Sequence, residues 1–490
     1  DIYYYFGREG VYFFPFWDVL PYDNFSPHKG LIAQRFQTLD ALLNQQARIL
    51  ITTPNALMQC FLPRNDFLKN TITLTNEFAV STDEIRQLLL NSGYIQVDVV
   101  EELGEFSTHG GILDVFPLNL EKPVRIEFSK NSKVQFLKPF DIQTQHTDQT
   151  ELGSLKILPA GEILFNQENI DFARQSLPEY RKECTPEVLL QLRQSLQKKE
   201  GFPGIESLSP LFYPELETLF DYFPDEFLLI VNEEKNVNKR ADSFYQEVFT
   251  EYEISGQQNK LTLSPESLFL THRELQTQLN KHVSLVLNSM NINNTAARTV
   301  HQLQFVDNKS LRHQFESAKA TSAAGYMVQL LQKWQSSGTP VLLSAKNQTH
   351  ADGFQQLLDD LGVESTSAGD QLTANRCPWL EWLEKNNTDN TSDSIPILTG
   401  KVSSGFRKLD SNGKALFVLL TEEEVFGEKT RNRRLQRAQI HQTAGNLDDL
   451  REGDHVVHLD YGIGLYHGLQ KISAGAKQKE YIQLVFARDQ

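Results

Sequence analysis

The sequence has little cysteine and no long hydrophobic run. Its three cysteines, Cys60, Cys184 and Cys377, lie far apart and form no CxxC pair. This odd, sparse set offers neither a CxxC metal-binding pair nor a disulfide framework, which fits a reducing, cytoplasmic location. No stretch of about 18 uncharged apolar residues occurs, so we predict no membrane-spanning helix.

Basic charge is also scarce. The 47 Lys and Arg residues are outnumbered by 63 Asp and Glu residues, and the net charge is −16. Proteins that lie along DNA neutralise phosphates with Lys and Arg, so this balance disfavours nucleic-acid binding as the main role and favours protein partners. The chain begins DIYYYF, with neither Met nor a basic signal region, which is typical of an internal segment of a longer protein.

Catalytic motifs are missing as well. A nucleotide-hydrolysing site needs a glycine-rich loop that ends in Gly-Lys-Ser or Gly-Lys-Thr, and the nearest match, Gly413-Lys414, is followed by Ala415. No HExxH, GxSxG or paired Cys-His spacing is present. His455 and His458 lie three apart on a predicted strand and therefore point to opposite faces. We predict a monomeric binding scaffold with no catalytic residue, no metal site and no cofactor.

At 490 residues the chain is too long for one hydrophobic core, and a multi-domain α/β fold is predicted. Hydrophobic periodicity and turn residues divide it into six segments. These are an α/β piece at 1–68, an α+β module at 69–157, a return of helix–strand alternation at 158–295, a small doubly wound α/β domain at 296–426, a basic linker helix at 427–449 and a strand-rich tail at 450–490.

The module at 69–157 has the clearest local signals. Ser81 and Glu84 form a capping-box pattern that predicts a helix start, and Gly93 is placed to end that helix. Short apolar runs then predict a small antiparallel sheet. On the predicted strand 124–128, alternation turns Arg125 away from the core, towards solvent or a partner.

Residues 227–231 form a continuous apolar run, which predicts a fully buried parallel strand. The run ends at Asn232 and Glu233, where a nucleotide site would carry a metal-binding Asp. A neutral amide binds Mg²⁺ more weakly than a carboxylate. Two interpretations stay open, a degenerate nucleotide site and an ordinary core strand with a polar exit.

Three stretches resemble the bacterial transcription-repair coupling factors, the Mfd family. They read WDVLPYDNFSPH at 17–28, GIESLSPLF at 204–212 leading to LFDYFP at 219–224, and GDHVVHLDYGIG at 453–464. They follow the family's order and span essentially the whole chain. The second also resembles the excinuclease B subunit, and the third resembles the polymerase-interaction module of CarD-type regulators.

The resemblance implies a division of labour. Segments 1–68 and 158–295 would be the halves of a degenerate, RecA-like excinuclease-B-like domain, and 69–157 an inserted domain that binds UvrA. Segment 296–426 would be a third domain, and the tail the start of a Tudor/CarD-like barrel that binds the RNA polymerase β subunit. An ATP- and Mg²⁺-dependent translocase on double-stranded DNA would follow beyond the chain. The implied function is transcription-coupled nucleotide excision repair; the alternatives are an excinuclease-B-like helicase and a CarD-like regulator.

For UvrA binding, the resemblance implies two arginines and an aromatic pair. The first arginine is replaced by His109, whereas the second is retained as Arg125. Of the aromatic pair, Phe128 remains and Ser129 replaces its neighbour. We expect Arg125→Glu to weaken UvrA binding without lowering the melting temperature; a solvated strand residue is the alternative.

For polymerase binding, the resemblance points to Ile472, with Leu469 and Lys471 beside it, after the GLYHG turn at 464–468. An apolar residue near a strand edge suits strand addition onto a partner sheet, and a barrel-core position is the alternative. The basic run at 429–437 favours a solvated linker helix, with contact to nucleic acid or an acidic partner as the alternative.

Overall fold

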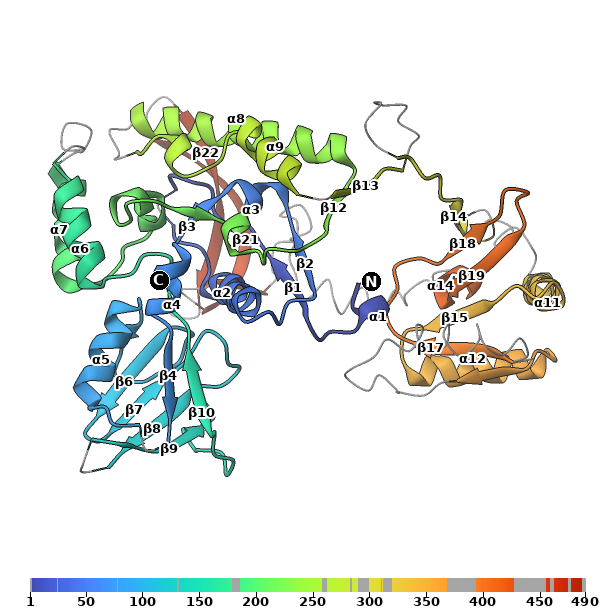
Figure 1. Cartoon of the computed structure of the whole chain (residues 1–490), viewed down its shortest axis with the longest axis horizontal. Coiled ribbons are helices and arrows are strands. Elements are labelled where there is room, and N and C mark those ends of the chain that lie inside the picture. Colours follow the sequence, from blue (N-terminus) through green and yellow to red (C-terminus); the bar gives the residue numbers. More distant parts are fainter. Residues whose placement is uncertain are drawn as a thin grey trace. The chain divides into compact units, whose positions relative to one another are not determined.

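Figure 1 shows the computed structural model of the chain. It describes residues 2–23, 25–76, 78–129, 132–178, 186–257, 262–282, 284–289, 299–309, 311, 320–367, 394–426, 455–458, 462–474 and 477–486. The basic run at 429–437 lies outside these residues. The chain forms two compact units, one of residues 8–299 and one that joins residues 1–7 to residues 300–490.

The unit of residues 8–299 begins with an α/β segment. Strands β1 (Val11–Phe14) and β2 (Ile49–Thr52) pair in parallel. Between them, helix α2 (Lys29–Leu43) buries Ile32, Phe36, Leu39 and Leu42, which recur at helical spacing. Three short elements follow: α3 (Pro54–Met58), β3 (Cys60–Phe61) and α4 (Arg64–Lys69).

The next part of this unit is an α+β module. Strand β4 (Ile72–Thr75) pairs with β10 (Ser154–Ile157), so the two ends of the module lie together. The predicted capping box is confirmed at Ser81, and helix α5 spans Thr82–Asn91. The sheet has the order β5-β6-β7-β8-β9. Its strands are β5 (Ile95–Gln96), β6 (Glu105–His109), β7 (Ile112–Val115), β8 (Val124–Phe128) and β9 (Val134–Pro139).

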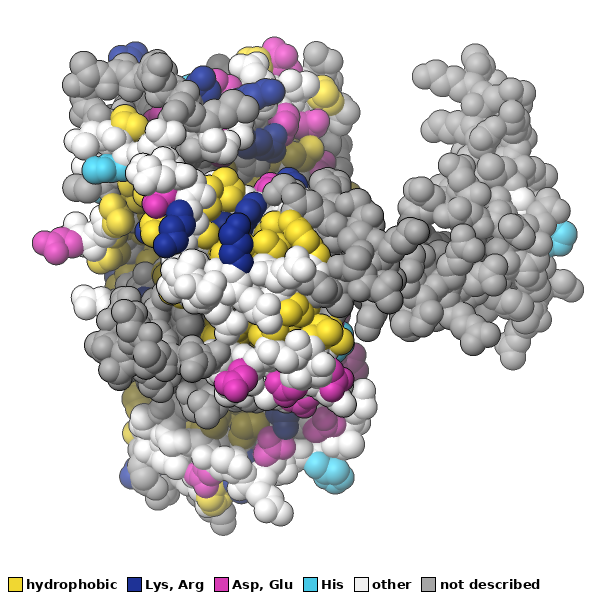
Figure 2. Space-filling view, turned by 90° about the vertical axis from the view of Figure 1, so that its right-hand side faces the viewer, with side chains coloured by type: hydrophobic (Ala, Val, Ile, Leu, Met, Phe, Trp, Pro, Cys, Tyr) yellow, Lys and Arg dark blue, Asp and Glu magenta, His cyan; other side chains and the backbone are white. Residues whose placement is uncertain are grey.

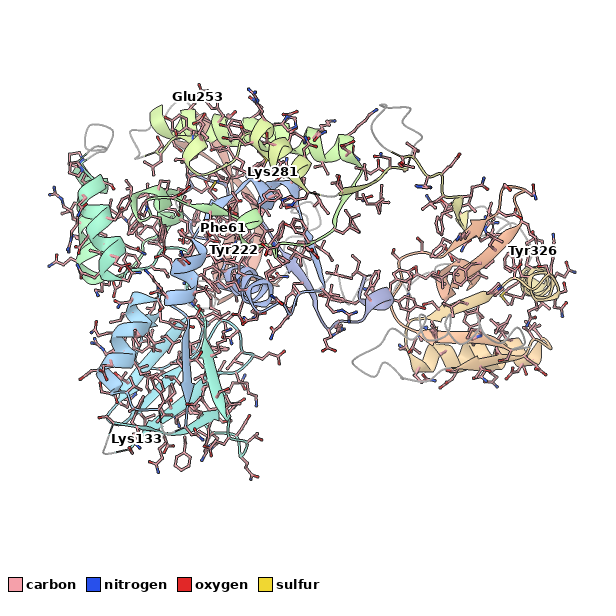
Figure 3. All side chains as sticks on the ribbon, in the orientation of Figure 1. Phe61, Lys133, Tyr222, Glu253, Lys281 and Tyr326 are labelled. Atoms are coloured by element: carbon pink, nitrogen blue, oxygen red, sulfur yellow. The ribbon has the colours of Figure 1, made fainter. Side chains whose placement is uncertain are left out.

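After the module, the chain returns to the first segment. Strand β11 (Glu217–Thr218) pairs with β3, and the ring centroids of Phe61 and Tyr222 are 5.6 Å apart (Figure 3). Segments before and after the module therefore share one core. The helices here are α6 (Gln167–Ser176), α7 (Pro186–Lys198), α8 (Glu234–Gln257) and α9 (His272–Lys281), with 3₁₀ segments η1 (Ile205–Leu211), η2 (Leu219–Tyr222) and η3 (Pro265–Ser267).

The apolar strand predicted at 227–231 needs a correction. Strand β12 (Leu229–Asn232) does pair in parallel with β13 (Ser284–Leu287). However, Leu228 and Ile230 are 58% and 55% exposed, so the strand is not fully buried. Alternate residues of β12 and β13 share a small hollow with side chains of α8 and α9, so these helices lie on one face of the strand pair. An apolar run does not reveal how many faces of a strand are covered.

The other unit centres on a six-stranded sheet of order β14-β18-β19-β15-β17-β16. Its strands are β14 (Phe305–Asp307), β15 (Val341–Ala345), β16 (Ser365–Ser367), β17 (Ile395–Thr399), β18 (Phe406–Leu409) and β19 (Ala415–Thr421). Strands β15, β16, β17 and β19 pair in parallel. Helices α11 (Ala320–Ser336) and α12 (Gln348–Asp360) share one hydrophobic cluster with the sheet.

Two smaller parts belong to the same unit. Helix α1 (Ile2–Phe6) packs Tyr4 against Leu342, Leu398 and Leu419, and α14 (Glu422–Phe426) follows β19. In the tail, β20 (His455–His458), β21 (Gly462–Ala474) and β22 (Lys477–Phe486) form an antiparallel sheet, which confirms the predicted strands. No helix in the described part of the chain is both long and apolar enough to cross a bilayer.

A buried ion pair joins the segments on either side of the α+β module. Arg35 of α2 donates from Nε to Oε1 of Glu162 over 2.8 Å, and both side chains are essentially inaccessible to solvent. Arg35 also donates from Nη1 to the carbonyl of Pro15 over 2.7 Å, and its guanidinium lies 4.3 Å from the ring centroid of Phe14. Trp17 donates a further hydrogen bond to Glu162 over 3.3 Å. Removing either charge would leave the other one buried and unpaired.

We predict that Glu162→Gln lowers the free energy of unfolding by about 3–5 kcal/mol, because it leaves the Arg35 guanidinium without a counter-ion. Urea unfolding followed by circular dichroism measures the change. The exposed pair Lys69–Glu168 supplies the control, and Glu168→Gln should change little. A double variant, Arg35→Met with Glu162→Leu, should be more stable than Glu162→Gln. Equal effects of Glu162→Gln and Glu168→Gln would contradict the prediction.

A second polar cluster ties Ser26, which precedes α2, to the start of η1. The hydroxyl of Ser26 donates to Oε2 of Glu206 over 2.7 Å and accepts from the backbone N–H of Gly204 over 3.1 Å. Burial raises the pKa of Glu206 to about 7. The folded protein therefore binds the Glu206 proton more tightly than the unfolded chain, and stability falls as the pH rises from about 4.5 to about 7.

We therefore predict that Glu206→Gln flattens the fall in stability between about pH 4.5 and 7, because the amide still accepts from Ser26 but cannot ionise. The free energy of unfolding is measured in urea at a series of pH values for both proteins. Glu121→Gln, at an exposed position, is the control. Parallel pH profiles for the wild type and Glu206→Gln would show that another group causes the fall.

Candidate protein-docking face

One face of the sheet in the α+β module is more exposed than the other, although Ser107 and Asp114 on it are buried. Phe106, Leu113, Ile126 and Leu137 are fully buried on the face that packs into the unit. Because side chains alternate along a strand, their neighbours lie on the opposite face, which we call the outer face. The register sets its residues in two rows across the sheet: Ser107, Asp114, Arg125 and Lys138 in one, and His109, Ile112, Glu127 and Phe136 in the other.

Arg125 is fixed at the centre of the outer face. Its guanidinium makes a two-pronged contact with Asp114, with Nε–Oδ1 and Nη2–Oδ2 distances of 2.8 Å. These hydrogen bonds raise the pKa of Arg125 above its usual value. The Phe140 ring lies 5.0 Å from the guanidinium carbon, and Nη1 is 3.5 Å from the Gln145 carbonyl. Arg125 is held in one orientation and keeps N–H groups for a further acceptor.

This contact corrects the expected effect of Arg125→Glu. Asp114 is only 8% exposed, so the substitution would place a second carboxylate beside a largely buried one. Such a contact lowers stability, whereas the sequence predicted an unchanged melting temperature. A neutral substitution that still donates to Asp114, such as Arg125→Gln, separates binding from folding more cleanly.

The structure brings only some of the predicted docking residues together. His109 is exposed at the end of β6 and shares the outer face with Arg125. Phe128 lies on the core face, where it packs against the hydrophobic cluster. Ser129 is in the turn that leads to β9, where it exchanges backbone hydrogen bonds with Lys133 and Ser132. The outer face therefore receives no aromatic ring from these positions.

Sequence reasoning missed three residues of this face. Asp114 holds Arg125, and Phe136 and Lys138 lie on β9, with the Lys138 ammonium 4.5 Å from the Phe136 ring centroid. Residues two apart on a strand share a face, which is the signal that links Phe136 and Lys138, but the strand expected from the sequence ended before Lys138. The sequence did not show which face that was.

Asn232 and Glu233, the residues of the predicted degenerate nucleotide site, lie where β12 ends and α8 begins. Asn232 is exposed at the end of β12. The carboxylate of Glu233 accepts the backbone N–H of Ser289 over 2.7 Å, and the Glu233 N–H donates to the Leu287 carbonyl over 2.7 Å. Glu233 thus ties β13 to the start of α8. Within the described residues, no group of three His, Cys, Asp or Glu side chains could hold a metal ion.

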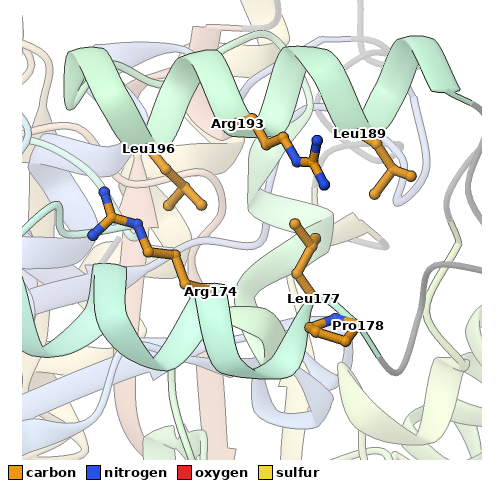
Figure 4. Close-up of a pocket in the computed structure, with 6 residues that line it drawn as sticks. All are labelled: Arg174, Leu177, Pro178, Leu189, Arg193 and Leu196. Atoms are coloured by element: carbon orange, nitrogen blue, oxygen red, sulfur yellow. The ribbon is translucent and has the colours of Figure 1, made fainter.

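A hollow of about 340 Å³ lies between α6 and α7 (Figure 4). Its lining combines leucines and a proline with two arginines: Arg174, Leu177, Pro178, Leu189, Arg193 and Leu196. Arg174 contacts Asp171 over 3.3 Å. Elsewhere, acidic side chains are interspersed among Lys and Arg on the face shown in Figure 2, with no continuous basic surface among its described residues.

In the tail, the side chains of Leu469, Lys471 and Ile472 lie outside the described residues. Their backbone is in β21, where Leu469 pairs with Ile482 and Ile472 pairs with Lys479 of β22. Strand β20 pairs only with Gly462 to Leu465 of β21. Among the described strands, the second edge of β21 therefore has no partner around Ile472.

Comparisons with known proteins find family matches for the α+β module and for the tail. The family model of the UvrB interaction domain matches residues 72–162, and that of the CarD-like/TRCF RID domain matches residues 450–490. Curated relatives named transcription-repair-coupling factor match nearly the whole chain. The protein from Haemophilus influenzae is 27% identical over 99% of this chain, that of Escherichia coli K12 28% over 96%, and that of Myxococcus xanthus 25% over 96%.

The chain spans about two fifths of the length of these relatives, with 40%, 39% and 38% of each covered. The match at 72–162 contains the whole outer face with Arg125 and Asp114, and the match at 450–490 contains β20, β21 and β22. Together these findings confirm the predicted resemblance of the chain to the amino-terminal part of the transcription-repair coupling factors.

Proposed function

We propose that this chain is a docking scaffold for transcription-coupled nucleotide excision repair, which binds UvrA through the α+β module and the RNA polymerase β subunit through the tail. The observation that carries the proposal is the outer face: a fixed, partly accessible arginine within the region that matches the UvrB interaction domain. ATP- and Mg²⁺-dependent movement along double-stranded DNA is assigned to the part of the coupling factors that this chain does not span.

Pre-organisation supports the UvrA assignment. The Asp114 contact and the Phe140 ring hold Arg125 before a partner arrives, so binding does not have to restrict a long, mobile side chain. Fixing such a side chain costs about 0.5–1.5 kcal/mol when it happens on binding. Strands of a five-stranded sheet also keep the spacing of the outer face constant.

Strand geometry supports the polymerase assignment. The edge of β21 around Ile472 offers backbone N–H and C=O groups that an added strand can pair with. The region lies inside the match to the CarD-like/TRCF RID domain. Backbone pairing would supply affinity, and side chains such as Ile472 would supply specificity.

Arg125→Gln should weaken the binding of purified UvrA by about tenfold or more, because a charge-assisted hydrogen bond contributes about 1.5–3 kcal/mol. Isothermal titration calorimetry measures the Kd, and circular dichroism verifies the fold. Lys122→Gln removes a different cation of the same module, one that contacts Asp148 over 2.9 Å, and should leave the Kd unchanged. Unchanged binding by Arg125→Gln would refute the assignment of the outer face to UvrA.

Ile472→Arg should reduce capture of the RNA polymerase β subunit, because a charged side chain would oppose strand addition at this position. Pull-down with the purified β subunit measures it. Ser473→Arg, the same substitution at the neighbouring position of β21, is the matched control. If Ile472→Arg instead lowers the melting temperature and keeps binding, Ile472 is a core residue.

A further inference from the structure

We infer that Phe136 and Lys138 on β9 form a second anchor of the outer face, which selects a partner surface with a carboxylate beside an apolar side chain. The inference rests on the proposed docking of UvrA and names the chemistry of that contact. It adds residues from a strand that contributed none of the docking residues expected from the sequence.

The register places both residues next to Arg125. Lys138 pairs directly with Arg125, and Phe136 pairs with Glu127, two residues further along β8. Directly opposed residues of an antiparallel pair have Cβ atoms only about 4.5–5.5 Å apart. One carboxylate of a partner can therefore meet both cations, while a side chain beside it reaches the Phe136 ring.

Lys138 is held by the ring and is still available to a partner. Its ammonium lies 4.5 Å from the centroid of Phe136, within the range of a cation–π contact. In the part of the chain that the structure describes, no carboxylate pairs with Lys138. Phe136 and Lys138 are both half-buried, so each keeps part of its surface for a partner. The cation is thus oriented without being neutralised.

The apolar part of the anchor extends beyond Phe136. Ile112 lies in the same row and is 36% exposed, which is unusual for an isoleucine in a sheet with a well-formed core. Glu127 lies between Ile112 and Phe136 in that row. A partner carboxylate is therefore repelled from the row of Phe136 and attracted to the row of Arg125 and Lys138, which fixes the orientation of the partner.

The test uses purified UvrA as the probe and the whole chain as the binder. Phe136→Ala should weaken binding by about tenfold or more, as expected when an aromatic anchor is truncated, whereas Phe136→Tyr should stay within about twofold. Lys138→Met keeps the stem over the ring and removes the charge. It should weaken binding about threefold or more and reduce the dependence of the Kd on salt.

Matched controls are Phe305→Ala, a 49% exposed phenylalanine of the other unit, and Lys122→Met, an exposed lysine of the same module. Both should bind normally. Weaker binding by Arg125→Gln together with normal binding by Phe136→Ala and Lys138→Met overturns this inference and leaves the proposed function standing. A wild-type chain that does not bind UvrA overturns both. If Phe136→Ala unfolds, the test rests on Lys138→Met: weaker UvrA binding supports the inference, and normal binding overturns it.

Discussion

The buried pair of Arg35 and Glu162 is the constraint on which the rest of this unit depends. Arg35 precedes the α+β module and Glu162 follows it, so the 2.8 Å contact closes the chain around the module. The pairing of β4 with β10 then holds the two ends of the module side by side. An unpaired charge at either position would be costly in this core. The segments before and after the module, which support the outer face, therefore cannot separate without exposing an unpaired charge at Arg35 or Glu162.

Local structure was predictable where short-range chemistry decides it. The capping box at Ser81 appears in the structure as the sequence predicts, because the residues of a cap are only three positions apart. The prediction that residues 227–231 are fully buried was wrong, because burial depends on contacts between distant segments. Whether a second layer covers β12 depends on segments far away in sequence, and an apolar run carries no information about them.

Only part of the outer face could be predicted from the sequence. Alternation placed Arg125 away from the core, but the Asp114 contact required the register of β7 against β8, which no local pattern sets. Phe128 is three positions from Arg125 and so belongs to the other side of the strand, a consequence of the pleat that the resemblance to a family had obscured. Phe136 and Lys138 became neighbours of Arg125 only once β9 was paired.

Arg125 and Lys138, two cations of the outer face, differ in the distance over which they can attract a partner. The Arg125–Asp114 pair is neutral as a unit, so it attracts a partner carboxylate only at short range, through directed hydrogen bonds. The chain as a whole carries a charge of −16 and repels acidic partners at a distance. Lys138, unpaired among the described residues, is therefore the group whose charge acts beyond contact distance, up to the screening length of about 8 Å at physiological salt. In the proposed docking, Arg125 would supply the geometry of recognition, and Lys138 would supply the longer-range attraction.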